Sequence, residues 1–573
     1  NDGRQVYEKL LASSFPDHNY GRQTTIGTIE HLKNPSLVKI REYYNTFYVP
    51  NNMAVIMVGD IDLAGTFLEV QKKFGYMQAK KVPKLVFEES NQPRQKEIIN
   101  VVGPSQESLM MGYRVPNAMD EDADLVLLVD LILANSSAGL IDLNMVKAQR
   151  CIQAYSSTMM LKERGLHYFA GTPLENQSLE DLQELFYEQI ELLKSGEFDM
   201  ELVKSIVLNQ KVSKIREYDS YRATAYSLMD AFVMNNSWSA ELSKLDHMLT
   251  YSKEDVTNFA IKYYSEGHVV VYKRQGDKSE SLKVDKPEIT KVEVNRGKTS
   301  PFVGDILARK TNPITPQILE YENEIAFGTI SGKVPVWKVK KGDDQLFSMY
   351  YVLDIGSLND QKLALAVEYL EYLGTEDYTA DQISTAFYKL ACNYGVSTGS
   401  EQSYVYLNGL ASEFEEAVQL FEHLLQNAVA DEGKLKQMVA QKLKSRKDAK
   451  LNKGAIMGRL RNYALYGQEN PSTYFLSEKE LMGIGGEELT TYIHNLGNYK
   501  HKVFYSGPLT IERLDGILSK LHTIPDEYLP TPSLKEFEMR DADGKSVYLA
   551  HYDMVQAEIM WLKKSTELAL SES

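Results

Sequence analysis

The segment LAVEYLEYLGT, Leu365 to Thr375, has the residue types of a helix that could carry a metal-dependent hydrolytic site. An acidic residue stands in mid-turn with a large residue beside it, and apolar residues then lead to a Gly-Thr pair. Residues three or four apart share one face of a helix, so two side chains there can reach one bound ion. The segment contains no histidine, however. Its residues leave two alternatives, the remnant of such a site and an ordinary amphipathic helix.

Histidine is the other residue type that could hold a metal ion here. The ten histidines are His18, His31, His167, His247, His268, His423, His494, His501, His522 and His551. His18 and His31 are the most suggestive pair, but 13 residues and a predicted turn separate them. A zinc site needs several ligands that converge on one ion. We therefore expect no metal ligation by this pair.

The two cysteines, Cys151 and Cys392, lie far apart in the sequence, and neither is part of a CxxC pattern. Two cysteines cannot form a disulfide framework, and a zinc or redox motif would need closer partners. We interpret both as isolated buried thiols.

Length and composition restrict the class of protein. The 573 residues are too many for one core and predict three or four domains of roughly 150 residues each. The net charge of −16 argues against nucleic acid as a partner, because phosphate binding needs a basic surface. The Lys-rich stretch from Lys434 to Lys450 is typical of a solvated helix face. No apolar run approaches the roughly 20 residues of a transmembrane helix.

One pattern recurs along the chain. Ser36 to Asp60 predicts a capped amphipathic helix, an aromatic pair, a turn and an apolar strand, Met53 to Val58, that closes at Gly59. Ser252 to Gly276 has the same order, and Gly485 to Gly507 is a looser third copy. The closing glycines lie at positions 59, 276 and 507, so the repeated unit is 217 to 231 residues long.

A second match occurs at about twice this interval. The strings PSQESLMMGYR and MVQAEIMWLKK, the latter from Met554 to Lys564, both place a glutamine before a predicted strand. Gln106 and Gln556 are 450 positions apart, and Gly59 and Gly507 are 448 positions apart. Two landmarks with nearly the same offset predict a duplicated pair of domains with a period of about 449 residues.

The elements expected within each unit are strands alternating with long amphipathic helices. Strands are predicted at Ser108 to Arg114 and Phe347 to Asp354, and helices at Leu182 to Leu193, Met200 to Tyr218 and Glu413 to Val429. These elements predict an α+β fold in which helices bury their apolar stripe on one face of a sheet. Between the halves, Gln275 to Pro316 is rich in Lys, Pro, Ser, Thr and Gly and predicts an extended linker.

The stretch FPDHNYGRQTTIGTIEHLKNPSLVKIREYYNTFYVPNNMAVIMVGDID, Phe15 to Asp62, resembles the closing segment of the catalytic domain of insulinase-type zinc peptidases. These are the inverzincins, which include pitrilysin, insulysin and mitochondrial processing peptidase. The resemblance is carried by an aromatic-Gly pair after a histidine, an Ile-Gly-Thr, a helix that ends in aromatic residues, VPNNM, an apolar strand and Gly-Asp. It implies four homologous α+β domains, each a mostly antiparallel sheet with helices on one face, in two halves that enclose a chamber.

In this family His-x-x-Glu-His on a helix supplies two zinc ligands and a general base, and a later Glu completes the ligand set. None of the histidines here forms that pattern. The resemblance places Glu368 at the position of the catalytic Glu, with Leu365 and Tyr369 at the two histidine positions. This copy is therefore expected to be degenerate, without metal and without hydrolytic chemistry. Arg150 and Tyr155 are weak candidates for a pair that holds the substrate carbonyl, and packing roles are the alternative for both.

The resemblance and the period together imply that this chain is an internal part of a longer protein. They place the zinc helix about 80 residues before Asn1, with the third ligand about two helical turns before Asn1, in a parent of about 850 residues. The expected domains are the end of the first, catalytic-type domain at 1–87, the second domain at 88–276, a linker at 277–325, the third domain, an inactive copy of the first, at 326–525, and the start of the fourth at 526–573.

The resulting hypothesis is a part of a zinc-dependent endopeptidase that degrades or processes peptides or unfolded proteins. Zinc is expected in the parent protein and none on this chain, and the other parts of the parent are expected as partners. A non-catalytic subunit or scaffold of the same fold is the second reading, and an unrelated binding protein with duplicated domains is the third. A periplasmic or otherwise exported, bacterial-type protein is favoured over a cytoplasmic one.

Overall fold

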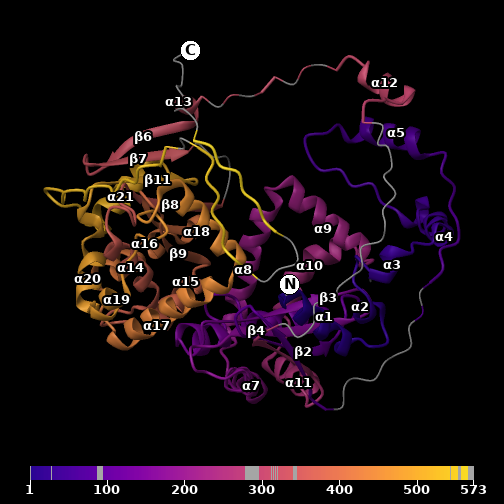
Figure 1. Ribbon diagram of the computed structural model, residues 1–573, viewed down its shortest axis with the longest axis horizontal. Helices are drawn as coiled ribbons and strands as arrows, with labels where there is room; N and C mark the ends of the chain where they lie inside the picture. Colours follow the sequence, from indigo (N-terminus) through magenta and orange to yellow (C-terminus); the bar gives the residue numbers. More distant parts are fainter. Residues whose placement is uncertain are drawn as a thin grey trace.

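The computed structural model describes residues 2–564 apart from residues 28, 85, 87–94, 278–295, 312, 314, 317, 319, 340–344, 542–543 and 553–556. The described chain forms two lobes, each built on one β-sheet with helices packed beside it (Figure 1). Most of the indigo-to-magenta part of the chain forms the first lobe, and the rose-to-yellow part from residue 325 forms the second. Residues 37–74, in indigo and purple, lie apart from both sheets. The predicted α+β class is confirmed.

The first lobe has a five-stranded sheet of order β1-β5-β2-β4-β3. Its strands are β1 (Glu97–Gly103), β2 (Ser108–Val115), β3 (Gln153–Met160), β4 (Gly165–Thr172) and β5 (Val269–Gln275). β1 and β5 are parallel, and the other neighbouring strands are antiparallel. Its helices are α1 (Asp2–Ser14), α2 (Asn19–Arg22), α6 (Ala123–Leu133), α7 (Leu179–Ser195), α8 (Glu201–Tyr218), α9 (Tyr221–Val233), α10 (Trp238–Met248) and α11 (Lys253–Tyr263). A π-helix, η2 (Asp142–Lys147), follows α6.

Both faces of the first sheet are covered. On one face Met111 and Phe169 pack into the main core, to which α6, α7 and α11 contribute. On the other face α1 and the residue after it, Phe15, cover the strands. Val6, Leu10 and Phe15 are buried there against strand residues such as Val101, Leu166, Val269 and Val271. Helices on a single face were expected, so α1 on the second face is an addition to the predicted architecture.

The second lobe repeats this topology with one extra strand. Its sheet has the order β6-β7-β11-β8-β10-β9. The strands are β6 (Ile325–Ile330), β7 (Val334–Val339), β8 (Leu346–Leu353), β9 (Cys392–Thr398), β10 (Ser403–Leu410) and β11 (His501–Ser506). β11 pairs in parallel with β7 and antiparallel with β8, just as β5 pairs in parallel with β1 and antiparallel with β2. The shared strand order and directions are those expected of a duplicated domain.

Helices of the second lobe cover one face of its sheet. They are α14 (Gln361–Tyr369), α15 (Ala380–Lys389), α16 (Phe414–Asn427), α17 (Glu432–Asp448), α18 (Lys453–Tyr466), α19 (Glu478–Gly483), α20 (Gly486–His494) and α21 (Ile511–Leu521). Short 3₁₀ turns are η3 (Leu370–Tyr372), η4 (Ala411–Glu413), η5 (Ala449–Leu451) and η6 (Leu496–Asn498). The core lies between this face and residues of α14, α16, α20 and α21.

The long helices expected from periodicity are present as α7, α8 and α16. Local signals fix both ends of α7. At α7 the Ser178 side chain accepts a hydrogen bond from the Asp181 N–H, and the Asp181 carboxylate accepts one from the Ser178 N–H. The helix ends at Gly196, whose φ of +75° lies in the left-handed region that glycine tolerates best.

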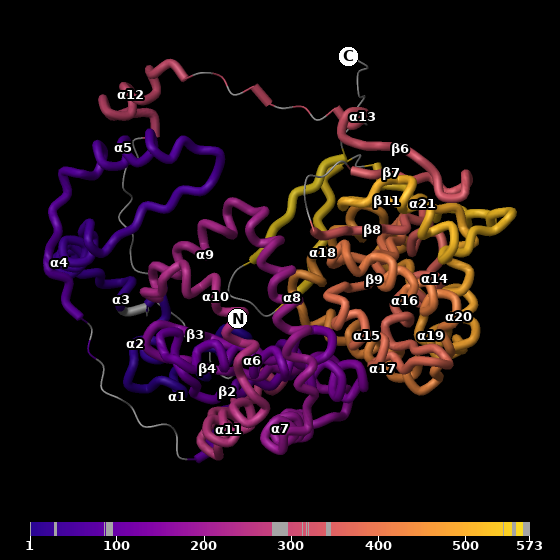
Figure 2. The backbone as a smooth tube through the Cα atoms, turned by 180° about the vertical axis from the view of Figure 1, so that it is seen from behind, coloured from indigo at the N-terminus to yellow at the C-terminus, as the bar shows by residue number. Residues whose placement is uncertain are grey.

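The first copy of the repeat forms its helices but not its strand. α4 (Leu37–Phe47) begins after Ser36, and η1 (Pro50–Asn52) and α5 (Leu63–Phe74) follow. The predicted strand Met53–Val58 is extended backbone without ladder partners, which corrects that prediction. A strand needs a neighbour for its N–H and C=O groups, and neither sheet of the described chain lies beside this segment (Figures 1 and 2).

Two further predictions differ locally from the structure. Residues 557–564, the described part of the predicted strand in Met554–Lys564, are not in a strand. In the predicted linker, α12 (Pro301–Leu307) forms where Ser300 caps a helix with proline at its first position. The four-residue helix α13 (Tyr321–Glu324) precedes β6, and α3 (Ile29–Lys33) precedes α4.

The two lobes touch through α8 and α15 (Figure 2). The Asn209 side-chain amide donates to the Tyr388 carbonyl at 2.7 Å, and the Ser384 hydroxyl donates to the Ser137 carbonyl at 2.8 Å. Tyr388 of α15 is itself buried in the main core of the first lobe. The second lobe is therefore anchored to the first by an apolar side chain and by backbone-directed hydrogen bonds.

Candidate functional site

The segment Leu365–Thr375 forms the end of α14 and the 3₁₀ turn η3. Asp360 caps α14, because its carboxylate accepts hydrogen bonds from the N–H groups of Lys362 and Leu363. Leu365 is 2% exposed and Tyr369 is 0% exposed, and both belong to the core of the second lobe. The apolar face of this helix therefore packs on the sheet and does not open towards a ligand.

Tyr369 uses its hydroxyl within the fold. The hydroxyl donates to the Asp431 carbonyl and accepts from the Asp431 N–H, each at 2.7 Å. Burial raises the pKa of the Tyr369 hydroxyl to about 12. A tyrosine binds a metal ion as phenolate, and this hydroxyl is neutral and already makes two hydrogen bonds, so it is unsuited to metal binding.

Glu368 lies on the opposite side of the helix, with its side chain 53% exposed. Its carboxylate forms an ion pair with Lys442 of α17. Leu365 offers no donor atom, Tyr369 is committed to Asp431, and the Glu368 carboxylate faces an ammonium group that would repel a cation. The residues at this position do not fit a zinc ion.

The remaining candidate metal ligands are also not gathered. His18 caps the short helix α2, and its Nδ1 accepts the Tyr20 N–H at 3.1 Å. Burial lowers the pKa of His18. His31 lies exposed in α3. Within the described ranges, no group of three or more His, Cys, Asp or Glu residues has the geometry to hold a metal ion.

Arg150 and Tyr155 flank the start of the edge strand β3. The Arg150 guanidinium pairs with Glu188 of α7 at 2.8 Å, and both groups are partly exposed. Tyr155 lies within β3, and its ring meets that of Tyr168 edge to face at 6.5 Å. Each side chain has a packing or pairing partner in its own lobe, and a role in substrate binding stays a prediction for both.

The two cysteines are buried free thiols, as predicted. Burial raises the pKa of Cys151 and of Cys392 to about 12. A thiol with such a pKa is protonated at neutral pH, and the thiolate is the nucleophile and metal ligand. Neither cysteine is therefore suited to catalysis or metal binding.

Sequence reasoning missed a buried polar network in the second lobe. His522 lies between Glu422, whose carboxylate is 2.9 Å from its Nδ1, and His501, whose Nε2 is 2.9 Å from its Nε2. The Tyr351 hydroxyl donates to the same Glu422 oxygen at 2.6 Å. Burial, and then the neighbouring His522, lowers the pKa of His501 to about 4. These residues come from α16, the end of α21 and two strands, so no sequence spacing could have identified them.

A contact between the lobes was missed for the same reason. Lys147 of η2 donates from Nζ to the Glu371 carbonyl of η3 at 3.1 Å. The Lys147 carbonyl in turn accepts from Lys434 of α17. Burial lowers the pKa of the Lys147 ammonium group. The 3₁₀ turn η3, which follows α14, and the helix α17 therefore take part in joining the lobes.

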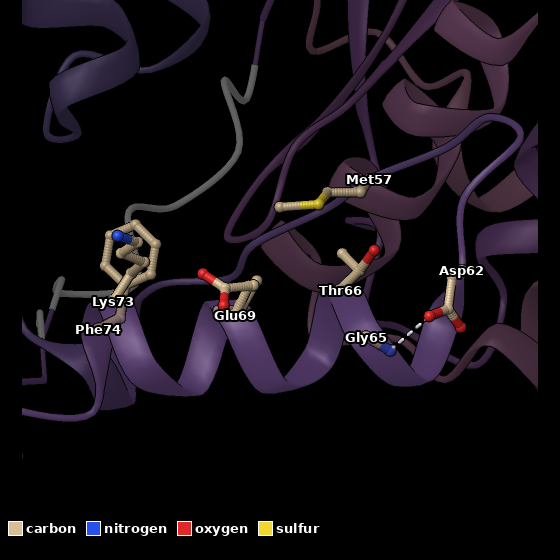
Figure 3. Close-up of a pocket in the computed structure, with 8 residues that line it drawn as sticks. Met57, Asp62, Gly65, Thr66, Glu69, Lys73 and Phe74 are labelled. Carbon is tan, nitrogen blue, oxygen red and sulfur yellow. Dashed lines mark hydrogen bonds between the residues drawn. The ribbon is translucent and has the colours of Figure 1, made fainter. Parts of the chain in front are cut away.

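Two surface hollows have no arrangement that suggests catalysis. The first, of about 440 Å³, lies between Met57 and α5, where Thr66, Glu69 and Lys73 project along the helix (Figure 3). Its other lining residues are Asp62, Gly65, Val70 and Phe74. The second, of about 620 Å³, lies beside Tyr113, Tyr187 and His268 in the first lobe. The His268 Nε2 and the Tyr187 hydroxyl form a hydrogen bond of 2.7 Å, so these two polar groups are paired with each other in the wall of the hollow.

The two sheets define a duplicated α+β protein, and the assignment of Leu365, Glu368 and Tyr369 to a degenerate metal site stays a prediction. Residues 36–209 match the family described as the peptidase M16 inactive domain. This match covers under half of the chain, and with the two relatives below it confirms the resemblance to insulinase-type zinc peptidases.

Two curated relatives have names of the same kind. Zinc protease PqqE of Helicobacter pylori is 24% identical over 236 residues, which are 40% of this chain and 53% of the relative. The uncharacterized zinc protease YmfH of Bacillus subtilis is 22% identical over 272 residues, which are 45% of this chain and 62% of the relative. The chain thus spans little more than half the length of these relatives.

Solved structures with a similar fold include two further proteases. The periplasmic protease PqqL from Escherichia coli aligns with a TM-score of 0.39 and 12% identity, over 94% of this chain and 62% of that chain. The ferredoxin protease FusC, in complex with Arabidopsis ferredoxin, aligns with a TM-score of 0.48 and 13% identity, over 94% of this chain and 63% of that chain.

Proposed function

We propose that this chain is part of a zinc-dependent endopeptidase that degrades or processes peptides inside a chamber enclosed by two halves. The observation that carries this proposal is the match of residues 36–209 to an M16 domain, together with the zinc protease names of two relatives. The zinc belongs to another part of the parent protein, since Leu365, Glu368 and Tyr369 do not fit the ion. The role of this chain is then to enclose and position the peptide.

We also propose the domain boundaries expected from the repeat. They are 1–87 for the end of the catalytic-type domain, 88–276 for the second domain, 277–325 for the linker, 326–525 for the inactive third domain and 526–573 for the start of the fourth. The first sheet, at 97–275, lies within the second of these domains. The second sheet, at 325–506, lies within the third except for its first residue, Ile325, which is the last residue of the proposed linker. The exposed apolar residues of α4 and α5 support a need for further parts of the parent chain as partners.

Metal content and peptidase activity test the first proposal. After dialysis, the 573-residue chain is expected to retain far less than one zinc per chain by elemental analysis and to leave a mixture of quenched fluorescent peptides uncut. The same chain joined to the polypeptide encoded immediately before it is expected to bind one zinc and to cut peptides. One zinc per isolated chain with peptidase activity would contradict the assignment.

A non-catalytic subunit or scaffold of the same fold is the second candidate. Two contacts of α14 favour this candidate. The Tyr369 hydroxyl bonds to the Asp431 backbone, and the Glu368 carboxylate pairs with Lys442, so both side chains serve the fold. About 120 residues encoded before Asn1 separate the candidates. His-x-x-Glu-His with a later Glu there supports the enzyme, and their absence supports the scaffold.

We also propose the partners and the location of the protein. We expect peptides or unfolded proteins as substrates, and the net charge of −16 disfavours nucleic acid. Among the described helices, none combines the length and hydrophobicity needed to cross a membrane. An exported, periplasmic location stays a prediction.

A further inference from the structure

Five aromatic side chains form one row across the sheet of the second lobe. Direct cross-strand partners link each ring to the next, from Phe327 to Trp337, Phe504, Tyr350 and Tyr406. They come from the adjacent strands β6, β7, β11, β8 and β10. Strands lie about 4.8 Å apart, so the row extends about 19 Å at right angles to the strands.

This aromatic row lies on the face opposite the helices. Side chains alternate between the faces of a strand, and the neighbours Val336, Val503 and Tyr351 are buried in the core. Phe327 is 60% exposed and Trp337 is 39% exposed. The other three rings are half-buried, and Tyr350 contacts Tyr406 and Phe504 at centroid distances of 5.7 and 6.3 Å. Large rings that a sheet exposes to solvent form an apolar surface on which a partner can pack.

A second row of neutral hydrogen-bonding side chains runs beside the aromatic row. Its members are also in direct register across four strands, in the order Ser506, Ser348, Asn408 and Asn393. Hydroxyl and amide groups both donate and accept, which is what the N–H and C=O groups of a polypeptide backbone require. The aromatic row and the Ser/Asn row together offer contacts for side chains and for a backbone.

Polypeptide already occupies the same face at one end. Leu346 and Leu410, a cross-strand pair on this face, contact Val212 of α8 in the first lobe. Arg216 of α8 donates to the Asn408 side-chain oxygen at 2.9 Å. In the first lobe, α1 covers the corresponding face of the sheet. The aromatic row is thus continuous with an established contact between a sheet face and a polypeptide segment.

We propose that the aromatic row and the Ser/Asn row bind an extended polypeptide segment with aromatic or large aliphatic side chains, which lies across the strands. An extended segment of about six residues matches the length of the row. Its apolar side chains stack on the rings, and its backbone bonds to Ser506, Ser348 and Asn393, while the Asn408 oxygen stays bonded to Arg216. This inference rests on the proposed function, for which it names the class of peptide.

The charges on this face favour a peptide over a nucleic acid. Single-stranded bases also stack on aromatic residues of a sheet, but their phosphates need a positive surface. Lys502 is the cation beside Trp337, 5.3 Å from its ring centroid, and its Nζ is 3.5 Å from an Asp354 carboxylate oxygen. Arg216 is a second cation on this face, where it bonds to Asn408. One neutralised pair, one arginine and a net charge of −16 give too little positive charge for a phosphate backbone.

Fluorescence anisotropy tests the proposal with the full chain. The probe is a labelled ten-residue peptide of alternating Phe or Leu and Ser or Thr, and a second peptide has Ser at every apolar position. The first peptide is expected to bind and the second not. Trp337→Ala is expected to weaken binding at least about tenfold, because a central aromatic side chain carries much of the binding free energy. Trp561→Ala, which removes a tryptophan that is 90% exposed outside any helix or strand, is expected to bind like the unchanged chain.

A second variant keeps the test valid if Trp337→Ala fails to fold. Phe327→Ser changes a side chain that projects into solvent, and it is expected to weaken binding while leaving the circular dichroism spectrum unchanged. Equal peptide affinity in Trp337→Ala and the unchanged chain would overturn the proposal. So would tighter binding of labelled oligo(dT), or a dimer in sedimentation that Trp337→Ala dissociates. The assay needs neither zinc nor cleavage, so its failure is distinct from failure of the proposed peptidase function.

Discussion

Tyr369 and Glu368 are adjacent in sequence but lie in opposite surroundings. Tyr369 is in the core and bonds twice to the Asp431 backbone, whereas Glu368 is half-exposed and pairs with Lys442. A half-exposed ion pair contributes little, while a buried polar group left without its partner is costly. The position that matches a catalytic Glu should therefore matter less to this chain than its neighbour.

Conservative substitutions test this ranking. Tyr369→Phe is expected to lower the free energy of unfolding by about 1–3 kcal/mol, because it leaves the Asp431 N–H and C=O without their partner. Glu368→Gln is expected to change it by less than about 0.5 kcal/mol. Urea unfolding followed by near-ultraviolet circular dichroism measures both. Tyr378→Phe, at an exposed ring, is the control and should have no effect. A larger effect of Glu368→Gln than of Tyr369→Phe would contradict this account.

The sequence could predict what the candidate site lacks, but not what replaces it. That Leu365 and Tyr369 carry no imidazole follows from residue type alone. The partners Asp431 and Lys442 lie 62 and 74 residues further along the chain, and only the folded lobe brings them to α14. Contacts between residues so far apart in the sequence cannot be predicted from local residue spacing.

At the scale of helices and strands, local signals predicted helices well and strands only where a sheet exists. α7 follows from its amphipathic spacing and from its own capping box and closing glycine, whereas α8 and α16 form without a side-chain cap at the first turn. Met53–Val58 has the residues of a strand, yet its backbone groups need a neighbouring strand that this chain does not place there. The parallel pairing of β5 with β1 and of β11 with β7 could not be predicted from the sequence either, because the partner strands are far apart along the chain.

Two copies of the repeat give a matched test of this difference. Ser252 caps α11 and Ser36 caps α4 through the same type of hydrogen bond to a backbone N–H. α11 buries Val256, Phe259 and Ala260, whereas α4 has no buried residue. Ser252→Ala is therefore expected to lower the free energy of unfolding of the first lobe by about 1 kcal/mol.

Ser36→Ala is the matched control. Loss of its cap is expected to leave the urea midpoint of the near-ultraviolet signal unchanged, because α4 has no core packing to lose. Equal shifts of the midpoint in the two variants would show that α4 is packed within the isolated chain, and would contradict the exposure described here.

At the scale of the whole molecule, the two lobes share one strand order and one pattern of parallel and antiparallel pairs. Their two sheet faces differ, since α1 covers one face in the first lobe and the aromatic row is exposed in the second. A duplicated fold thus presents one closed and one open sheet face. What fixes these faces relative to each other is the contact between α8, η2, α15 and α17.

Tyr388 is the side chain on which that contact is expected to depend most. It belongs to α15 of the second lobe, yet it is buried in the core of the first, while the adjacent Phe387 is buried in the core of its own lobe. Tyr388→Ala removes an aromatic side chain from between the lobes, at a cost of about 3–5 kcal/mol. Calorimetry is expected to show that unfolding of the lobes separates into two transitions.

Phe387→Ala is the matched control, because it creates a cavity of similar kind within the second lobe alone. It is expected to lower the unfolding temperature of the second lobe without weakening the contact between the lobes. Proteolysis offers a second readout, because separated lobes expose α8 and α15 to cleavage in Tyr388→Ala and not in Phe387→Ala. If both variants unfold with the same calorimetric profile, the lobes are held together by the polar contacts of Lys147, Asn209 and Ser384, and the apolar anchor is not what joins them.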